Sequence, residues 1–246
     1  MSALAIQSAI EVEAAVAPVL ARGLGKAIDG RAILRDIDLE VRPGEFVAIL
    51  GANGAGKSTL LKIIATLTAA SSGELRLFGR PVTRDNAGLR ARIGLIGHQS
   101  MLYRDLTARE NLEFFGRLYG IEKPVARARQ LLEVVGLADR ADDAVKSFSR
   151  GMVQRVAIAR ALVHNPELML ADEPFDGLDA PSVTATEALL THLHSLGKTI
   201  ILVNHDIPQS LELARRIVVL RRGAVAVDAP ARSLDVTTAL NEVGGV

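Results

Sequence analysis

One glycine-rich segment combines residue types and a spacing that suit the binding of phosphate groups. It fits the pattern Gly-x-x-x-x-Gly-Lys-Ser, and its residues are Gly51, Ala52, Asn53, Gly54, Ala55, Gly56, Lys57, Ser58 and Thr59. Glycines let the backbone fold tightly, so that successive N–H groups and the start of the next helix face an anion. In such a loop the lysine reaches the β- and γ-phosphates of a nucleotide, and the next hydroxyl coordinates Mg²⁺. The segment therefore predicts a nucleotide site.

Two adjacent acids further along the chain could complete that chemistry. Asp172 and Glu173 directly follow the apolar run Leu168–Ala171. A buried strand that ends in two acids would place Asp172 near the metal and leave Glu173 able to polarise a water. The same pair could instead cap the next turn. Because the chain already has a phosphate-binding segment, we favour the catalytic interpretation.

These residues need a scaffold that brings separate loops together, and the apolar pattern predicts one. Strand-like runs alternate with longer helical patterns, which is typical of parallel strands joined by helical crossovers. A helix is expected from about Lys57 to Thr68, directly after the glycine-rich segment. We therefore predict an α/β fold with a mostly parallel sheet, the core of a P-loop NTPase. The predicted strands are Phe46–Leu50, Ile93–Ile96, Leu168–Ala171, Thr199–Val203 and Ile217–Leu220.

Between residues 101 and 149 the pattern changes to helix alone. Thr107 and Glu110 form a capping box, a signal for the start of a helix. Pro124 suits the first turn of a second helix. We expect an inserted helical subdomain at about residues 101–160.

Composition excludes several classes of protein. Among 246 residues, 29 Lys and Arg against 28 Asp and Glu give a formal net charge of +1, unlike the basic surface of a non-specific nucleic-acid binder. We expect no nucleic-acid partner. The absence of cysteine excludes disulfides, thiol catalysis and zinc sites with cysteine ligands. No stretch has the ~18–20 apolar residues that cross a membrane, and the N-terminus lacks the basic start of a signal peptide. We therefore expect a soluble intracellular protein.

Four further segments resemble motifs of the ABC-type ATPases. Ser149–Gln154, before a helical stretch, is similar to the signature motif of that family. Gln99 matches its Q-loop, Asp179 its D-loop and His205 its switch histidine, and all occur in the order of the family. The resemblance covers roughly residues 19–227.

The resemblance implies a single nucleotide-binding domain over residues 19–246, after an N-terminal extension of residues 1–18. It also implies an antiparallel β part near the N-terminus of that domain. In this family two such domains, identical or different, close head to tail around ATP. Each ATP then lies between the P-loop of one subunit and the signature motif of the other, here Ser149 and Gly151.

The resemblance also assigns roles to single residues. Glu173 would orient or activate the attacking water, while His205 and Lys57 would hold the γ-phosphate. Ser58, Gln99 and Asp172 would hold Mg²⁺, and Gln99 would sense the membrane partner. Asp179 would complete the ATP site, together with the P-loop and the signature motif.

The sequence departs from the family pattern at three positions. Arg150 and Met152 flank Gly151 where the common signature motif has Gly and Gln, but Ser149 and Gly151 are retained. Family members stack adenine on an aromatic residue roughly thirty positions before the P-loop lysine, and Ile28 occupies that position here. An aliphatic side chain offers no π face, with an expected loss of ~1 kcal/mol, so we expect GTP to be tolerated.

Three classes of ABC protein are compatible with the resemblance. A soluble ATPase of translation or repair would carry two such domains or a long coiled coil, whereas only 50 residues separate Gln99 from Ser149. An inactive scaffold would lack Lys57, Glu173 or His205. We therefore expect a transporter subunit, peripheral on the cytoplasmic face of the cell membrane and bound to integral membrane subunits.

The substrate prediction depends on a narrower resemblance. The run Gly94–Gln99 and the run Leu102–Leu112 are similar to the ATP-binding subunit of the haem exporter of cytochrome c maturation (CcmA type). So is Asp172–Phe175. Multidrug and polysaccharide exporters share these features and remain the alternative.

Overall fold

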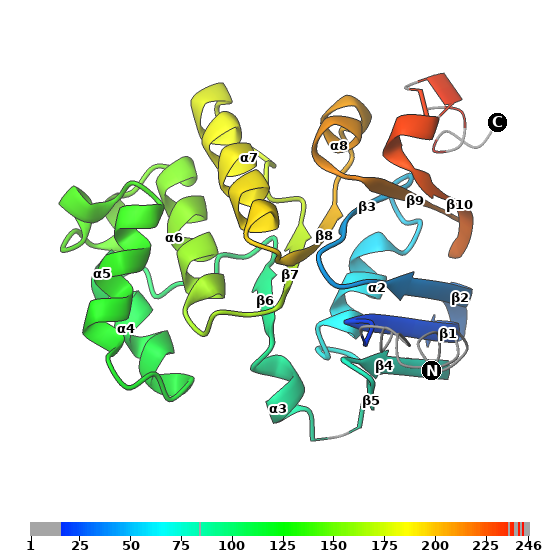
Figure 1. Cartoon of the computed structure of the whole chain (residues 1–246), viewed down its shortest axis with the longest axis horizontal. Coiled ribbons are helices and arrows are strands. Elements are labelled where there is room, and N and C mark those ends of the chain that lie inside the picture. The colour runs from blue at the N-terminus through cyan, green and yellow to red at the C-terminus, as the bar shows by residue number, and fades with distance from the viewer. Residues whose placement is uncertain (1–15, 84, 236, 239–240, 242, 244–246) are drawn as a thin grey trace, which may run out of the picture.

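The computed structural model describes residues 16–83, 85–235, 237–238, 241 and 243. Residues 1–15 of the expected extension lie outside this described part. A six-stranded sheet runs through the centre of the molecule in the order β10-β9-β3-β8-β7-β6 (Figure 1). Five of its strands, β9, β3, β8, β7 and β6, are parallel to one another. The sixth, β10, pairs antiparallel with β9. The strands are β3 (Phe46–Leu50), β6 (Ile93–Ile96), β7 (Leu168–Asp172), β8 (Thr199–Val203), β9 (Arg216–Arg221) and β10 (Ala224–Pro230).

A second, antiparallel sheet packs beside the first, in the order β2-β1-β4-β5. Its members are β1 (Val19–Ile28), β2 (Arg31–Val41), β4 (Ser72–Leu77) and β5 (Arg80–Pro81). The mixed architecture therefore confirms the predicted α/β class with a mostly parallel sheet and an antiparallel N-terminal part.

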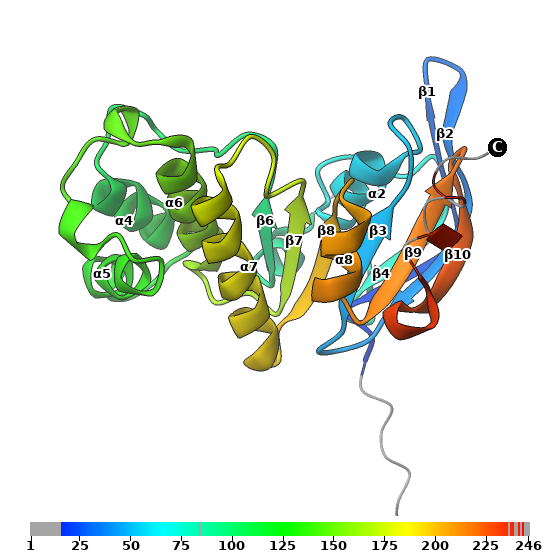
Figure 2. The ribbon, with the colours of Figure 1, turned by 90° about the horizontal axis from the view of Figure 1, so that it is seen from above.

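Helices cover the central sheet, and a group of helices lies beyond one of its edges. Helices α4, α5 and α6 form a group next to β6, at the end of the molecule away from the antiparallel sheet (Figures 1 and 2). The predicted capping box of Thr107 and Glu110 is formed at the start of α4. The helices are α2 (Lys57–Ile64), α3 (Ala87–Arg90), α4 (Ala108–Leu118), α5 (Pro124–Val134), α6 (Arg150–Leu162), α7 (Ala180–Ser195) and α8 (Ile207–Leu213). Short 3-10 turns lie at Ala138–Arg140, Val145–Ser147 and Ala231–Ser233.

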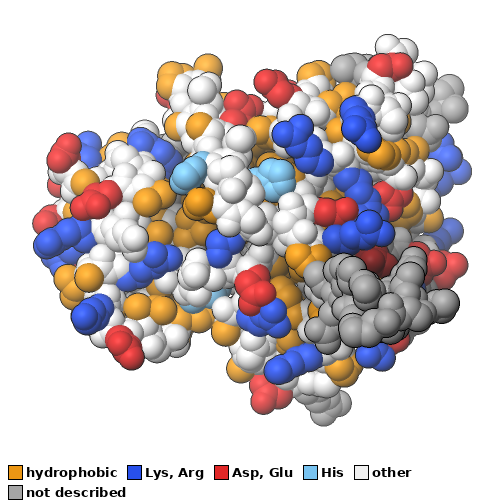
Figure 3. Space-filling view, in the orientation of Figure 1, with side chains coloured by type: hydrophobic (Ala, Val, Ile, Leu, Met, Phe, Trp, Pro, Cys, Tyr) orange, Lys and Arg blue, Asp and Glu red, His pale blue; other side chains and the backbone are white. Residues whose placement is uncertain are grey.

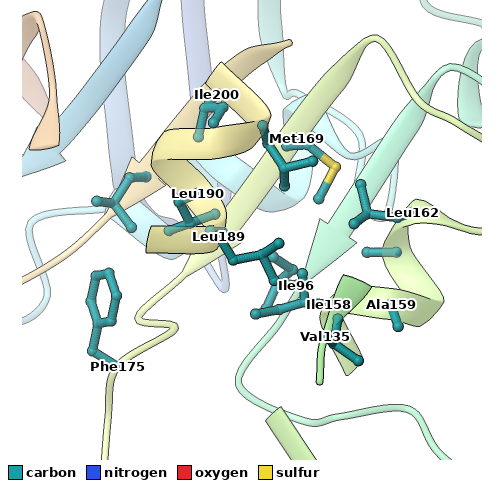
Figure 4. Packing of buried hydrophobic residues seen from close by; sticks show 14 of the residues in the cluster. Ile96, Val135, Ile158, Ala159, Leu162, Met169, Phe175, Leu189, Leu190 and Ile200 are labelled. Atoms are coloured by element: carbon teal, nitrogen blue, oxygen red, sulfur yellow. The ribbon is translucent and has the colours of Figure 1, made fainter. Parts of the chain in front are cut away.

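The central strands divide their side chains between two hydrophobic cores. Along β3, Phe46, Ala48 and Leu50 join the core under α6, α7 and α8, while Val47 and Ile49 join the core with α2 and the antiparallel sheet. Side chains of a strand alternate between the faces of its sheet, so a strand buried on both faces must be apolar throughout. Figure 4 shows part of the first core, in which Leu189 and Leu190 of α7 lie near Ile96, Ile158 and Ile200.

The helix after the glycine-rich segment is shorter than the sequence predicted. It ends at Ile64 and not at Thr68. Thr66 adopts a left-handed backbone with φ 59°, and the N–H of Leu67 donates to the carbonyl of Lys62 at 2.9 Å. This closing turn satisfies carbonyls at the end of the helix and prevents its continuation. Within the described residues, no helix is both long and apolar enough to span a membrane.

Candidate functional site

The order of the central strands brings four loops to one edge of the sheet. The loops after β3, β8, β7 and β6 carry the P-loop, His205, the Asp172–Glu173 pair and Gln99 respectively. Carboxyl ends of parallel strands meet at the same edge, which is where ligands of open α/β sheets bind. Site residues that lie far apart in the sequence are therefore on neighbouring loops in space.

Two glycines fix the shape of the P-loop. Gly51 has φ 150°, and a Cβ there would collide with the backbone oxygen of Leu220. Gly56 has φ 103° and precedes α2, and its Cβ would lie 2.6 Å from Cδ2 of Leu34. A side chain at either position would push the loop away from its support. No side chain caps α2, so the N–H groups of its first turn are available to an anion.

Lys57 lies folded back beneath the P-loop. Its ammonium group donates to the carbonyls of Gly51 at 2.8 Å and Ala52 at 3.2 Å, and only 5% of the residue is exposed. Burial lowers the pKa of Lys57, while the nearby carboxylates of Glu173 and Asp172 act in the opposite direction. Lys57 and the two acids are therefore close enough to interact electrostatically, as expected of charged residues around one phosphate site.

A cavity of about 490 Å³ joins the metal candidates. Its lining includes Ser58, Gln99, Asp172 and Glu173. The hydroxyl of Ser58 donates to Oδ1 of Asp172 at 3.0 Å, so these two oxygens are close enough to share one cation. Oxygen ligands are the ones Mg²⁺ prefers, and it commonly takes the rest from phosphates and water. The hydroxyl of Ser58 and the carboxylate of Asp172 are oxygen donors of this kind, so the residues present fit such an ion.

Glu173 has a backbone that its residue type does not favour. Its φ is 51°, and its N–H donates to the carbonyl of Val203 at the end of β8 at 2.9 Å. A left-handed backbone at a non-glycine residue is uncommon and occurs often at functional sites. Gln154 of α6 donates to the carbonyl of Pro174 at 2.9 Å and supports the same loop.

His205 follows β8 at the same edge, with its side chain exposed. Its backbone N–H donates to Oδ1 of the buried Asn204 at 2.9 Å. The sequence patterns did not identify Asn204 or Gln154 as supports of the site. A polar Asn directly after the apolar run of residues 200–203 was the available signal for the first.

The signature residues form a separate group. Ser149 is the N-cap of α6 and accepts from the N–H of Met152 at 3.3 Å. Gly151 packs so closely on Ser182 that a Cβ would collide with its hydroxyl, and Asp179 caps α7 by accepting from the N–H of Ser182 at 3.2 Å. Hydrogen bonds from Ser182 hold the pKa of Asp179 below its usual range. Among the described residues, no hydrogen bond joins this group to the P-loop.

Comparison with known proteins identifies the class. The ABC transporter family matches residues 34–176, and the chain belongs to that family as an ATP-binding domain and an ATPase. It is 40% identical over 195 residues to the ABC transporter ATP-binding protein NatA of Bacillus subtilis, covering 78% of this chain and 79% of that one. It is also 40% identical over 228 residues to the phosphonates import ATP-binding protein PhnC of Anaeromyxobacter dehalogenans, covering 87% of this chain and 45% of that one.

Solved structures agree with the fold. A dimeric ATP-binding cassette, MJ0796, bound to ADP and phosphate, superposes with a TM-score of 0.79 at 32% identity, over 88% of this chain and 100% of that one. CbiO1 of Clostridium perfringens, part of the ABC transporter complex cbiONQ, superposes with a TM-score of 0.81 at 27% identity, over 93% of this chain and 94% of that one. Curated relatives include ATP-binding proteins named for import and for export.

Proposed function

We propose that this chain binds ATP with Mg²⁺ at the carboxyl edge of its central sheet and hydrolyses it to drive transport through separate integral membrane subunits. The observation that carries the proposal is the single cavity shared by Ser58, Gln99, Asp172 and Glu173, with Lys57 beside it. Mg²⁺ supplies neutralisation of phosphate charge when it is bound. Ser58 and Asp172 would hold it, with Gln99 of the same cavity as a further candidate ligand.

We propose the remaining roles from the family resemblance and from the place of each residue at this edge of the sheet. Lys57 and the free N–H groups at the start of α2 bind the phosphates. Glu173 orients the attacking water and accepts its proton, and His205 holds the γ-phosphate. Positioning and charge neutralisation supply most of the catalysis of phosphoryl transfer.

The separation of the signature group from the P-loop supports a requirement for a second domain. Ser149 and Gly151 lie at the start of α6, where a helix N-terminus favours an anion. In this proposal they contact a nucleotide that the P-loop of a partner domain holds. We therefore propose a homodimer or heterodimer of nucleotide-binding domains, by analogy with the dimeric cassette MJ0796.

An exposed apolar surface next to Gln99 offers a place for the membrane subunit. Met101 shares the cavity of Gln99, and the ring of Tyr103 contacts that of Phe114 with centroids 5.1 Å apart. Leu118 follows one turn later on α4, and all four apolar residues are exposed. Exposed apolar patches of this kind mark interaction sites. We propose that this surface docks the membrane subunit, with the chain on the cytoplasmic face of the membrane.

For the substrate, we propose haem export, with multidrug or polysaccharide export as the alternative. The support is the resemblance of Gly94–Gln99 and Leu102–Leu112 to the haem exporter. In the second run the buried Asn111 accepts from the N–H of Tyr103 at 2.8 Å and donates to its carbonyl at 2.9 Å. Residues that carry the resemblance thus shape the proposed docking surface. Purification of the chain with its membrane partners tests this: components of cytochrome c maturation support haem, whereas a drug or polysaccharide permease overturns it.

The variant Glu173→Gln tests the site. Loss of the general base should lower the turnover of ATP by about 10²–10⁴-fold, while ATP binding persists and traps the dimer. Hydrolysis assays and size-exclusion chromatography with ATP measure the two effects. Asp176→Asn, which removes an exposed carboxylate from the same loop, is the matched control and should hydrolyse ATP normally. Normal hydrolysis by the Glu173→Gln variant would place the base elsewhere.

A further inference from the structure

The peptide that carries His205 is held by a buried amide. Asn204 is 1% exposed, and its Oδ1 accepts from the N–H groups of His205 at 2.9 Å and Asp206 at 3.3 Å. Its Nδ2 donates to the carbonyl of Asp206 at 3.3 Å. The side chain therefore closes a tight loop around the backbone of His205. These hydrogen bonds fix the backbone from which the imidazole projects.

A second amide extends this support to a different helix. Nδ2 of Asn204 also donates to Oε1 of Gln209 on α8 at 2.8 Å, and Nε2 of Gln209 donates to Oε1 of Glu187 on α7 at 2.7 Å. The order of donors and acceptors fixes the orientation of both amides. If Gln209 were flipped, two NH₂ groups would face each other and an oxygen would face the carboxylate.

Glu187 provides a rigid anchor for this chain of hydrogen bonds. Helix α7 is capped by Asp179, and its buried Leu189 and Leu190 pack in the main core (Figure 4). Side chains on a packed helix hold their position better than side chains on a loop. The loop of His205 is therefore fixed against α7 and not only against its own strand.

We propose that Gln209, acting through Asn204, is a positioning residue that holds His205 in place for ATP hydrolysis, with Glu187 as its anchor. The proposal goes beyond the ATP site described above and rests on the role proposed there for His205. A displacement of a positioned group by about 1 Å can lower a rate as much as about 10²-fold. Loss of the Gln209 bridge should therefore reduce kcat and leave the KM for ATP nearly unchanged, because Lys57 and the P-loop bind the phosphates.

A charge swap tests the network. In Gln209→Glu two carboxylates face each other, and we expect kcat to fall by about tenfold or more. Glu187→Gln should retain kcat, because the amide that replaces the carboxylate can turn its oxygen to accept from Gln209. The double variant Glu187→Gln/Gln209→Glu restores every donor and acceptor, since the new amide donates to the new carboxylate, and it should recover kcat to within about twofold. Glu212→Gln, at an exposed position of the same helix, is the matched control.

Thermal unfolding and the NMR signals of the His205 ring are measured on the same variants as the kinetics. A fall in kcat for Gln209→Glu at unchanged KM, a shifted His205 ring signal and recovery in the double variant support the proposal. An unchanged kcat in Gln209→Glu overturns it, and so does a loss that the swap does not restore. If wild-type protein hydrolyses ATP but the His205→Ala variant does so equally well, the role of His205 itself fails, which separates that failure from failure of the network.

Discussion

Several residues of this site adopt backbone conformations with a positive φ. Gly51 and Gly56 adopt conformations that exclude a side chain, and their residue type indicates this. Glu173 adopts a left-handed backbone without such a signal, and the carbonyl of Val203 holds it there. The left-handed backbone of Glu173 interrupts the extended conformation of the preceding strand at the cavity of Ser58 and Asp172. Glu173 lines that cavity together with Ser58 and Asp172.

Ile28 gives a prediction at the same scale. It lies at the end of β1 in the hairpin tip with Arg31 and is 47% exposed. Gly56 packs on Ile33 and Leu34 of the same hairpin, so this hairpin lies against the P-loop. We expect wild-type protein to use GTP as well as ATP, and Ile28→Tyr to bind ATP about fivefold more tightly through stacking. Competition of GTP against ATP in hydrolysis measures this, and a strong preference of the wild type for ATP would contradict it.

At the level of elements, His164 joins the helical subdomain to the central sheet. Its ring stacks on Tyr119 at the end of α4 with centroids 3.9 Å apart, and its Nε2 hydrogen-bonds the carbonyl of Ile93 in β6 at 2.9 Å. That carbonyl requires a donor, so Nε2 carries the proton in the neutral ring. Burial is the main cause that lowers the pKa of His164, and Arg160, Arg127 and Lys198 lower it further.

The lowered pKa predicts a pH dependence of stability. Unfolded protein takes up a proton at His164 as the pH falls through about 6.5, whereas folded protein resists until a lower pH. The free energy of unfolding should therefore decrease on acidification in this window, by at most about 1.4 kcal/mol per pH unit from this group. His164→Gln keeps a donor and should lose this part of the slope. Denaturant titrations at pH 7, 6 and 5 measure the difference, and equal slopes for both proteins would refute it.

At the scale of the whole molecule, the distribution of charge does not indicate a partner, whereas the exposed apolar residues do. Lysine and arginine side chains are interspersed with acidic ones on the face shown in Figure 3, as a net charge of +1 suggests. No single-sign surface on this face would steer a charged partner. The exposed apolar residues Met101, Tyr103, Phe114 and Leu118, next to the cavity of Gln99, are the stronger indication of a partner.

Leu118→Glu tests that surface. Leu118 is 68% exposed, so the substitution should not disturb folding, but a buried carboxylate would oppose docking. We expect weaker co-purification with the membrane subunit and an unchanged basal ATPase rate. Val134→Glu, at a position 50% exposed on α5, is the matched control and should still co-purify. Equal recovery of the membrane subunit with both variants would place the docking surface elsewhere.

Much of this protein could be predicted from its sequence because the informative patterns are local. An apolar run buried on both faces, a capping box and a glycine-rich loop each act over a few residues, so β3, α4 and the P-loop lie where expected. The end of α2 could not be located in the same way. Its closing turn depends on Thr66 adopting a left-handed backbone, which the residue type of a threonine does not indicate.

The sequence by itself determined the class of chemistry: phosphate-binding glycines, a lysine, a hydroxyl and two acids at defined spacing. Only the tertiary structure decided how these residues act together. Strand order places the loop of His205 between the P-loop and the Asp172–Glu173 pair. Hydrogen bonds from Gln154 to Pro174 and from Gln209 to Glu187 support these loops. Such contacts join residues far apart in the chain, and no local pattern encodes them. Their energies arise only when the packed sheet and helices bring the partners within hydrogen-bond distance.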